Sequence, residues 1–379
     1  MTSEDFFEKI NEHFERKLPF VVYRKPNEKS VKCFLQNNDQ LFTSEELSET
    51  GFIFAPFDNQ KQNILIPENS SEKLIFKYEG GKLISEEKKI HSEENLSQEK
   101  AEKNKFQHIS LVKKGISALN SGNMEKVVLS RKEEIPLKGK DPLELFQQLL
   151  ENYENAFVYC WFHPKVGLWL GASPETLLKV EGKQFSTMSL AGTQKFQEKA
   201  KVEWGEKEKQ EQKFVTDEII SSLKAFSSKI SVSEVHTAKA GNLLHLKTDI
   251  KGEISAENLK DVVFAIHPTP AVCGLPKEEA KKFIFEEENY DREFYTGFLG
   301  ELNLKNKISR SGNRRNVENQ AYAAVRTESS LYVNLRCMKI EGENAILFIG
   351  GGITKDSIAE DEWQETVNKA ETMKKVLRK

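Results

Sequence analysis

Apolar, strand-like runs joined by short turns constrain the fold of this 379-residue chain more than any other feature. Such runs occupy residues 157–162, 167–171, 176–180 and 185–190, and the EGK segment at 181–183 predicts a hairpin turn. Helical patterns fall between clusters of strands, so a regular alternation of strand and helix is absent. This grouping predicts an α+β fold in which antiparallel sheets are flanked by helices.

Helices are expected wherever apolar residues recur at helical spacing. The expected segments are residues 4–16, 107–121, 203–226 and about 357 to the end. A further helix begins at 141–142, where an aspartate can cap the first turn and a proline suits it. Strands return at residues 332–353, with a turn at 341–344.

The density of the pattern divides the chain into two parts. Residues 1–105 form an N-terminal part that ends in a charged, polar segment at about 79–105, which we expect to be an exposed connector or a mobile helix. Residues 106–379 carry the dense pattern of strands and helices, and we expect the chemistry there.

Composition excludes several classes of function. The chain has 56 basic and 59 acidic residues, so its net charge of −3 gives no electrostatic case for binding nucleic acid or an anionic membrane. The acidic N-terminus does not resemble a signal peptide, and no apolar run approaches a membrane span. Four cysteines lie far apart, which predicts neither a zinc site nor a disulfide framework and fits a reducing cytoplasm: Cys33, Cys160, Cys273 and Cys337.

The C-terminal segment 349–369 suggests a binding site. Three consecutive glycines follow a strand, and bare glycine backbone can bring N–H groups close to an anion. On the next helix, Glu362, Glu365 and Lys369 share one face. Two neighbouring carboxylates repel unless a cation joins them, so the segment indicates an anionic metabolite held through a divalent metal. A plain turn followed by a solvated helix face is the alternative.

Two residues at strand ends are candidates for acid–base chemistry. Lys126 heads the apolar strand KVVLSR, where partial burial could make it a base, although such a lysine is normally exposed and inert. Glu175 ends the GASPE segment, and in an apolar pocket it could stay protonated and act as an acid. Many carboxyl groups at strand ends simply face solvent.

Further motifs follow along the chain. They are LAGT at 190–193, the rigid proline-rich HPTPAVCGLP at 267–276 and DREFYTGFLG at 291–300. LRC at 335–337 places Arg336 within an apolar strand, where a guanidinium needs an anion. A structural ion pair and a substrate carboxylate are both suitable partners.

In this order, KVVLSR, GASPE, LAGT, HPTPAVCGLP, DREFYTG, LRC, GGGI and EWxET resemble the motifs of the chorismate-utilising enzymes. The resemblance covers about residues 106–379 and marks that part as a chorismate-binding catalytic region. It implies one large α+β domain, Mg²⁺ as cofactor and chorismate as substrate. It also implies a monomer without an obligate glutaminase partner.

Within the family, the motifs are most similar to those of isochorismate synthases, which are isomerases. Lys126 matches the lysine that activates water, and Ala191 stands where aminodeoxychorismate synthases carry a nucleophilic lysine. Salicylate synthase is the main alternative, followed by the ammonia-using anthranilate and aminodeoxychorismate synthases. A non-catalytic binding subunit is less consistent with an acid–base pair.

The resemblance also assigns site residues. Lys126 and Glu175 are the expected base and acid, and Glu211, Glu362 and Glu365 the expected Mg²⁺ ligands. Substrate binding is expected from Ala191, Gly192, Thr193, His267, Thr269, Ala271, Val272, Tyr295, Arg336, Gly350, Gly351, Gly352 and Lys369. Among these, His267 orients the C4 hydroxyl or makes a structural hydrogen bond. One departure stands out, because Gln212 follows Glu211 where the family usually has a Glu-His pair.

Overall fold

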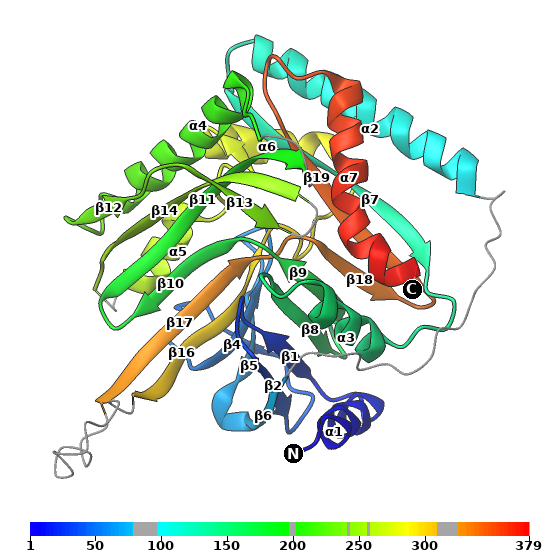
Figure 1. Cartoon of the computed structure of the whole chain (residues 1–379), viewed down its shortest axis with the longest axis vertical. Helices are drawn as coiled ribbons and strands as arrows, with labels where there is room; N and C mark the ends of the chain where they lie inside the picture. The colour runs from blue at the N-terminus through cyan, green and yellow to red at the C-terminus, as the bar shows by residue number, and fades with distance from the viewer. Residues whose placement is uncertain (79–96, 197–201, 241–242, 256–257, 309–323, 379) are drawn as a thin grey trace.

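Two large antiparallel sheets form the framework of the molecule, as Figure 1 shows. The computed structural model describes residues 1–78, 97–196, 202–240, 243–255, 258–308 and 324–378. The strands of the first sheet follow the order β15 (Gly274–Leu275), β7 (Lys126–Pro136), β19 (Asn344–Ile353), β18 (Cys337–Glu341), β9 (Gly167–Ser173), β8 (Phe157–His163), β1 (Phe20–Arg24), β2 (Ser30–Gln36) and β6 (Ser71–Lys77).

The second sheet contains the hairpins that the sequence predicted. Its order is β12 (Ile230–Val232), β14 (Leu243–Glu253), β11 (Gln184–Lys195), β10 (Thr176–Glu181), β17 (Ala324–Val333), β16 (Phe298–Ile308), β4 (Gly51–Ala55), β5 (Ile64–Pro67) and β3 (Phe42–Thr43), with β13 (His236–Ala240) paired to β14. The EGK turn joins β10 to β11, and the turn at 341–344 joins β18 to β19. Antiparallel pairing throughout both sheets confirms the α+β class.

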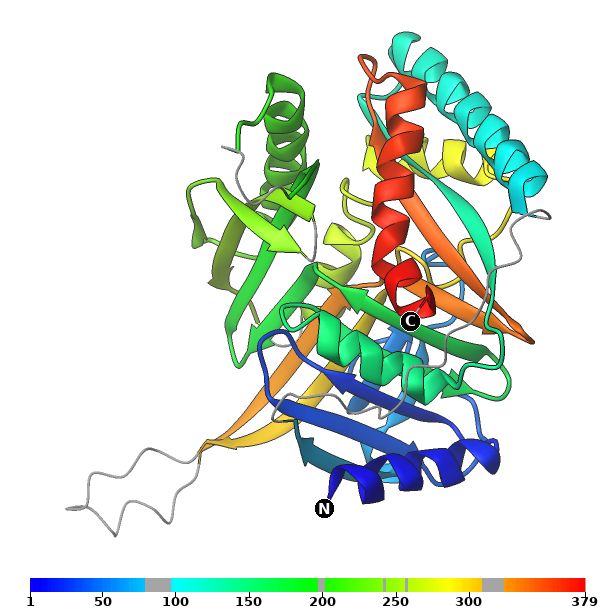
Figure 2. The same ribbon diagram turned by 45° about the vertical axis from the view of Figure 1, so that its right-hand side comes forward.

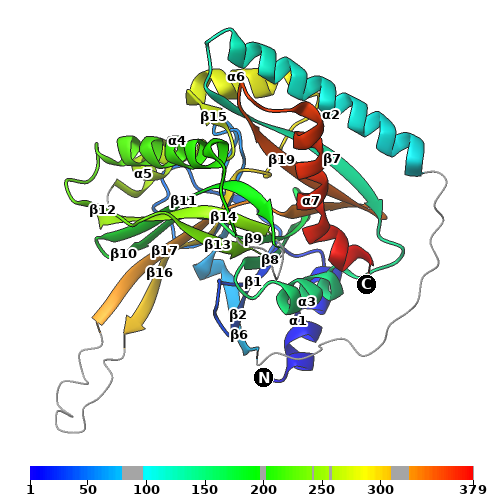
Figure 3. The ribbon, with the colours of Figure 1, turned by 45° about the horizontal axis from the view of Figure 1, so that its top comes forward.

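Helices cover the outer faces of the sheets. They are α1 (Ser3–Glu15), α2 (Ser97–Asn120), α3 (Pro142–Asn152), α4 (Glu206–Leu223), α5 (Leu259–Ile266), α6 (Lys277–Glu287) and α7 (Ala359–Arg378), with a 3₁₀ turn at Glu68–Ser70. Figure 2 shows α7 crossing the first sheet beside α2, and Figure 3 shows α4 lying over the second sheet. Asp141 caps α3 by accepting hydrogen bonds from two backbone N–H groups, as expected. None of the described helices is long and apolar enough to cross a membrane.

The N-terminal part completes both sheets. Strands β1, β2 and β6 extend the first sheet, while β3, β4 and β5 extend the second. Of the two expectations for the segment at 79–105, the helix holds for its last residues, because α2 begins at Ser97. Helix α2 is anchored by Val112 and Leu119, which are buried against β7. Because extending a formed helix costs less than starting one, the charged residues before this anchored part can continue the helix. Residues 79–96 lie outside the described part.

Aromatic side chains fill the space where the two sheets face each other. Phe157 on β8 stacks on Tyr332 of β17, and Phe54 on β4 stacks on Phe294, each with ring centroids 4.2 Å apart. Such contacts stabilise the interface beyond the burial of area alone. They fix one sheet against the other and thereby fix the strand ends that border the site.

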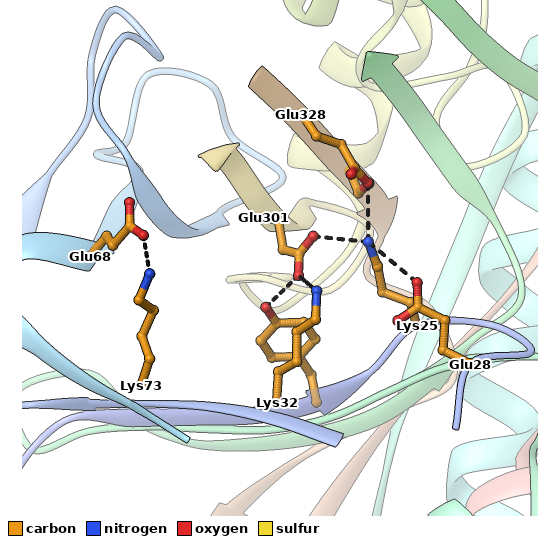
Figure 4. Close-up of polar contacts among 9 residues, drawn as sticks. Lys25, Glu28, Lys32, Glu68, Lys73, Glu301 and Glu328 are labelled. Carbon is orange, nitrogen blue, oxygen red and sulfur yellow. Dashed lines mark hydrogen bonds and ion pairs between the residues drawn. The ribbon is translucent and has the colours of Figure 1, made fainter. Parts of the chain in front are cut away.

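A buried carboxylate also joins the sheets, as Figure 4 shows. Glu301 on β16 is fully buried and accepts hydrogen bonds from Lys32 at 2.7 Å, Lys25 at 3.0 Å and the Tyr23 hydroxyl at 2.6 Å. Burial alone would raise the pKa of Glu301, but Lys25 and Lys32 hold it below its usual value. Glu328 of β17 contacts Lys25 as well, at 3.0 Å.

Replacing Glu301 with glutamine should destabilise the protein by about 3 kcal/mol, because buried Lys25 and half-buried Lys32 then keep their charges with a partner removed. Glu68→Gln, which breaks the more exposed Glu68–Lys73 pair in Figure 4, is the matched control and should cost less than about 1 kcal/mol. Urea unfolding at neutral pH measures both. Because the pKa of folded Glu301 is lowered, its contribution should disappear as pH falls through that pKa. Equal costs for the two variants would contradict this account.

Candidate active site

Most of the expected site residues line one cavity between the second sheet and α7. The cavity has a volume of about 80 Å³. The expected residues that line it are Glu175, Ala191, Gly192, Thr193, Glu211, Ala271, Val272, Tyr295, Arg336, Gly350, Gly351, Gly352, Glu365 and Lys369. We call it the inner cavity. Lys126, His267, Thr269 and Glu362 are buried behind its lining.

Lys126 is fully buried at the start of β7 and meets Glu211 of α4. Its Nζ lies 2.9 Å from Glu211 Oε1 but is poorly aligned for a hydrogen bond, so the contact is mainly electrostatic. Gly352 makes room for this contact. A Cβ at position 352 would lie 2.6 Å from Glu211 Oε1 and 2.9 Å from Lys126 Cε. The missing side chain therefore lets β7, β19 and α4 converge.

Glu175 follows β9 and has the properties of an acid that keeps its proton. Burial raises the pKa of Glu175 to about 8, although the charge of Lys126, the nearby Thr269 hydroxyl and Arg336 act to lower it. The backbone N–H of Glu175 donates to Ser173 Oγ at 3.3 Å, which fixes the chain at this point. Burial therefore favours the protonated form of this carboxyl, which lines the inner cavity.

The three expected metal ligands surround the glycine backbone of β19. A Cβ on Gly351 would lie 3.7 Å from Glu362 Oε2 and 3.7 Å from Glu365 Oε1, while Glu211 adjoins Gly352. Lys369 Nζ lies 2.5 Å from Glu365 Oε1. Among the described residues, no three acidic, histidine or cysteine side chains converge closely enough to bind a metal in this arrangement. The three side chains nevertheless offer carboxylate oxygens, the hard ligands that Mg²⁺ prefers. They lie on both sides of the glycine backbone.

The departure at Gln212 has a structural explanation. Gln212 points away from the inner cavity, and its Nε2 lies within 3.0 Å of the hydroxyls of Ser189, Thr216 and Thr248. This buried network holds α4 against β11 and β14. Glu211, one residue earlier, faces the cavity instead. Glutamine at position 212 thus leaves the acidic side chain at 211 in place.

The position of Arg336 corrects the sequence analysis. Arg336 lies in the bend between β17 and β18 with a φ of 47°, and not in the middle of a strand. The three glycines likewise form the end of β19, paired with β7, and do not follow the strand. The guanidinium of Arg336 donates to Lys369 O at 3.4 Å, and no described carboxylate lies within ion-pair distance. An anion is therefore the natural partner for its remaining donors.

Polar residues behind the cavity fix its walls. His267 lies behind the wall, where its Nε2 donates to Thr296 O at 3.1 Å, and burial lowers the pKa of His267 to about 3. Arg292 was missed by the sequence analysis, although it belongs to the DREFYTG motif. It pairs with Glu288 and donates to Val128 O and Val272 O. Because both valines line the cavity, this guanidinium holds the two backbone segments of its wall together.

His245 was also missed, and it lines the inner cavity. It lies on β14, where its Nδ1 donates to Gly192 O at 2.8 Å. Burial, helped by Arg336, lowers the pKa of His245 to about 3, so the ring is neutral. A histidine between leucines in the run 243–246 was the available signal, because a buried strand rarely contains a polar side chain without a partner.

Comparisons with known proteins identify relatives of this chain. The family profile described as "Chorismate binding enzyme" matches residues 60–309 and 321–378. The chain is 33% identical over 267 residues to isochorismate synthase EntC from Escherichia coli, covering 67% of this chain and 62% of that protein. It is 30% identical over 275 residues to isochorismate synthase MenF from Pasteurella multocida, covering 68% and 58%. The matched part thus spans about three fifths of these relatives.

Solved structures share the fold. An isochorismate synthase structure, DhbC from Bacillus anthracis, superimposes with a TM-score of 0.74 at 22% identity, covering 97% of this chain and 99% of that one. Anthranilate synthase component I from Streptococcus pneumoniae superimposes with a TM-score of 0.63 at 18% identity, covering 94% and 92%. At these identities, the likeness establishes the fold.

Burial of Glu175 should make stability depend on pH. Because its pKa is raised when folded, the folded state holds a proton that the unfolded state releases, so stability falls from about pH 4.5 to about pH 8. Glu175→Gln removes this loss and should be more stable than the parent at pH 9, on the order of 2–4 kcal/mol. Urea unfolding at pH 5 and pH 9 tests it, with the exposed Glu12→Gln as control. An equal difference in unfolding free energy between the variant and the parent at both pH values would contradict the raised pKa.

Proposed function

The chain belongs to the family of chorismate binding enzymes, and from this premise we propose that it is an isochorismate synthase. In this reaction water adds at ring C2 of chorismate, the double bond shifts and the C4 hydroxyl leaves. The observation that carries the proposal is a buried lysine and a buried glutamate, whose pKa burial raises, beside one cavity. A protein that only bound its ligand would gain nothing from burying this pair, which costs stability.

Two carboxylates of chorismate need cationic partners. Arg336 has donors free of any described carboxylate, and Tyr295 lies close enough for the two to influence each other's charge. We assign both to the enolpyruvyl carboxylate, with backbone N–H groups at Gly351 and Gly352 nearby. The ring carboxylate lies toward Lys369 and the acidic face of α7. Ala271 and Val272 line the ring pocket, where their size influences which nucleophile enters.

Acid and base then act on different atoms of the ring. Lys126 takes a proton from the water that attacks C2, while Glu175 gives its proton to the C4 hydroxyl, which leaves as water. One proton is taken and one is given, so the step is balanced. Lys126 acts as a base only as the neutral amine, and its contact with Glu211 must therefore loosen in the working complex. Glu175 must carry a proton to act as an acid, and burial favours this form by raising its pKa.

The acidic side of the cavity supplies the hard oxygen ligands that suit magnesium. Glu211, Glu362 and Glu365 would hold it, directly or through water, because their carboxylates surround Gly351 and Gly352. When bound, Mg²⁺ would neutralise the ring carboxylate and stabilise negative charge there. Without the ion, the cations Lys126 and Lys369 partly neutralise two of these carboxylates.

The same proposal covers partners and compartment. The four cysteines are buried and free, which suits a reducing cytoplasm. The isolated chain should act as a monomer on chorismate without a glutaminase, because the base and the acid both come from one chain.

Lys126→Met and Glu175→Gln should each lower turnover by about 10³-fold or more, because each removes a proton-transfer group. The change of chorismate affinity should be small, since Arg336 and Lys369 remain. Turnover is measured by separating products after incubation with chorismate and Mg²⁺, and affinity by calorimetry. Lys282→Met, a change of an exposed lysine on α6, is the control. Undiminished turnover in either site variant would refute its assignment.

Changing Mg²⁺ and pH with the wild-type protein provides a second test. Turnover should stop when EDTA removes Mg²⁺, and it should fall as pH rises through about 8, because Glu175 then loses its proton. Salicylate and pyruvate as products would instead indicate a salicylate synthase. Product formed only with ammonia would indicate an amino-transferring member of the family, and no product would leave a binding role.

A further inference from the structure

A second, larger cavity adjoins the inner cavity and shares part of its wall. Pro174, Leu190, His245 and Arg336 line both. The second cavity lies between the β13–β14 hairpin, the C-terminal half of α7 and the segment 152–156. We call it the vestibule. Because Arg336 borders both spaces, an anion in the vestibule is next to the residue that we assign to a substrate carboxylate.

The lining of the vestibule is basic. Lys239, Lys247, Lys375 and Arg336 contribute positive charges, and Glu154 is its acidic residue. Lys247 is offset by Asp249 at 2.8 Å. Lys239 and Lys375 have no ion-pair partner among the described residues, and the ammonium of Lys239 lies 3.5 Å from the centroid of the Phe196 ring. This excess contrasts with the chain as a whole, whose net charge is −3.

Along helix α7, the charge that faces the two cavities changes from acidic to basic. Glu362 and Glu365 lie in its first half, and Lys369 follows at the inner cavity. Thr372 and Lys375 continue the same side of the helix into the vestibule. The acidic end suits a divalent cation, whereas the basic end attracts an anion. A dianionic substrate would therefore meet repulsion at the carboxylates and attraction at the vestibule.

We infer that the vestibule is the route by which the small ring dicarboxylate reaches the inner cavity, steered by Lys239, Lys247 and Lys375 toward Arg336. This inference rests on the proposed function for the identity of the dicarboxylate. Steering acts on the association rate, and salt weakens it because the Debye length is only about 10 Å at 0.1 M. Saturated turnover depends on groups in the inner cavity and is independent of the steering lysines.

Stopped-flow tryptophan fluorescence measures how fast chorismate associates. The double variant Lys239→Gln/Lys375→Gln should associate about fivefold more slowly at low ionic strength, and the double glutamate variant more slowly still. The difference should vanish at about 0.5 M salt. The matched control is Lys113→Gln/Lys282→Gln, which removes two exposed lysines outside both cavities. Its association rate and salt dependence should equal those of the wild type.

The outcomes separate the two proposals. Identical salt dependence in the vestibule double variant and the control overturns the inference, even if chorismate is converted. Association that depends on Lys239 and Lys375, without any isochorismate formed, refutes the proposed function and leaves the route intact. Absence of chorismate association overturns both.

Discussion

The contact between Lys126 and Glu211 is the constraint on which the site depends. An ammonium that is fully buried needs a carboxylate beside it, because an unpaired charge in the interior is very costly. Lys126 lies on β7 of the first sheet, whereas Glu211 lies on α4, which packs on β11 of the second sheet. They meet only because Gly352 has no side chain. The buried network around Gln212 and the guanidinium of Arg292 then hold these elements at the required spacing.

The same interior gives the two proton-transfer groups different environments. No cation among the described residues lies within ion-pair distance of Glu175, so burial outweighs the charges of Lys126 and Arg336 and raises its pKa. Lys126 has Glu211 at 2.9 Å. Such groups cost stability, and the fold offsets this cost elsewhere, through the aromatic interface and the carboxylate of Glu301. A site with unfavourably buried ionisable groups needs a framework that is stable elsewhere.

Much of the fold was readable from local patterns. Hairpin turns and capping at Asp141 predicted element types correctly, because local backbone chemistry determines them. Apolar periodicity predicted α2 only from residue 107, and the segment before it was expected to be either a connector or a helix, since tertiary anchoring extends that helix to Ser97. At the site, motifs placed most lining residues, but His245 and Arg292 act through contacts between distant segments. The bend at Arg336 was also invisible, because a positive φ in an arginine has no sequence signature.

The central claim is that solvent water becomes the C2 hydroxyl of the product. Incubating the chain with chorismate and Mg²⁺ in ¹⁸O-labelled water, followed by mass spectrometry of the product, tests it most directly. The account predicts isochorismate with one solvent-derived oxygen, formed by the wild type and lost in Lys126→Met. Isochorismate without the label, or labelled isochorismate formed equally fast by Lys126→Met, would contradict it.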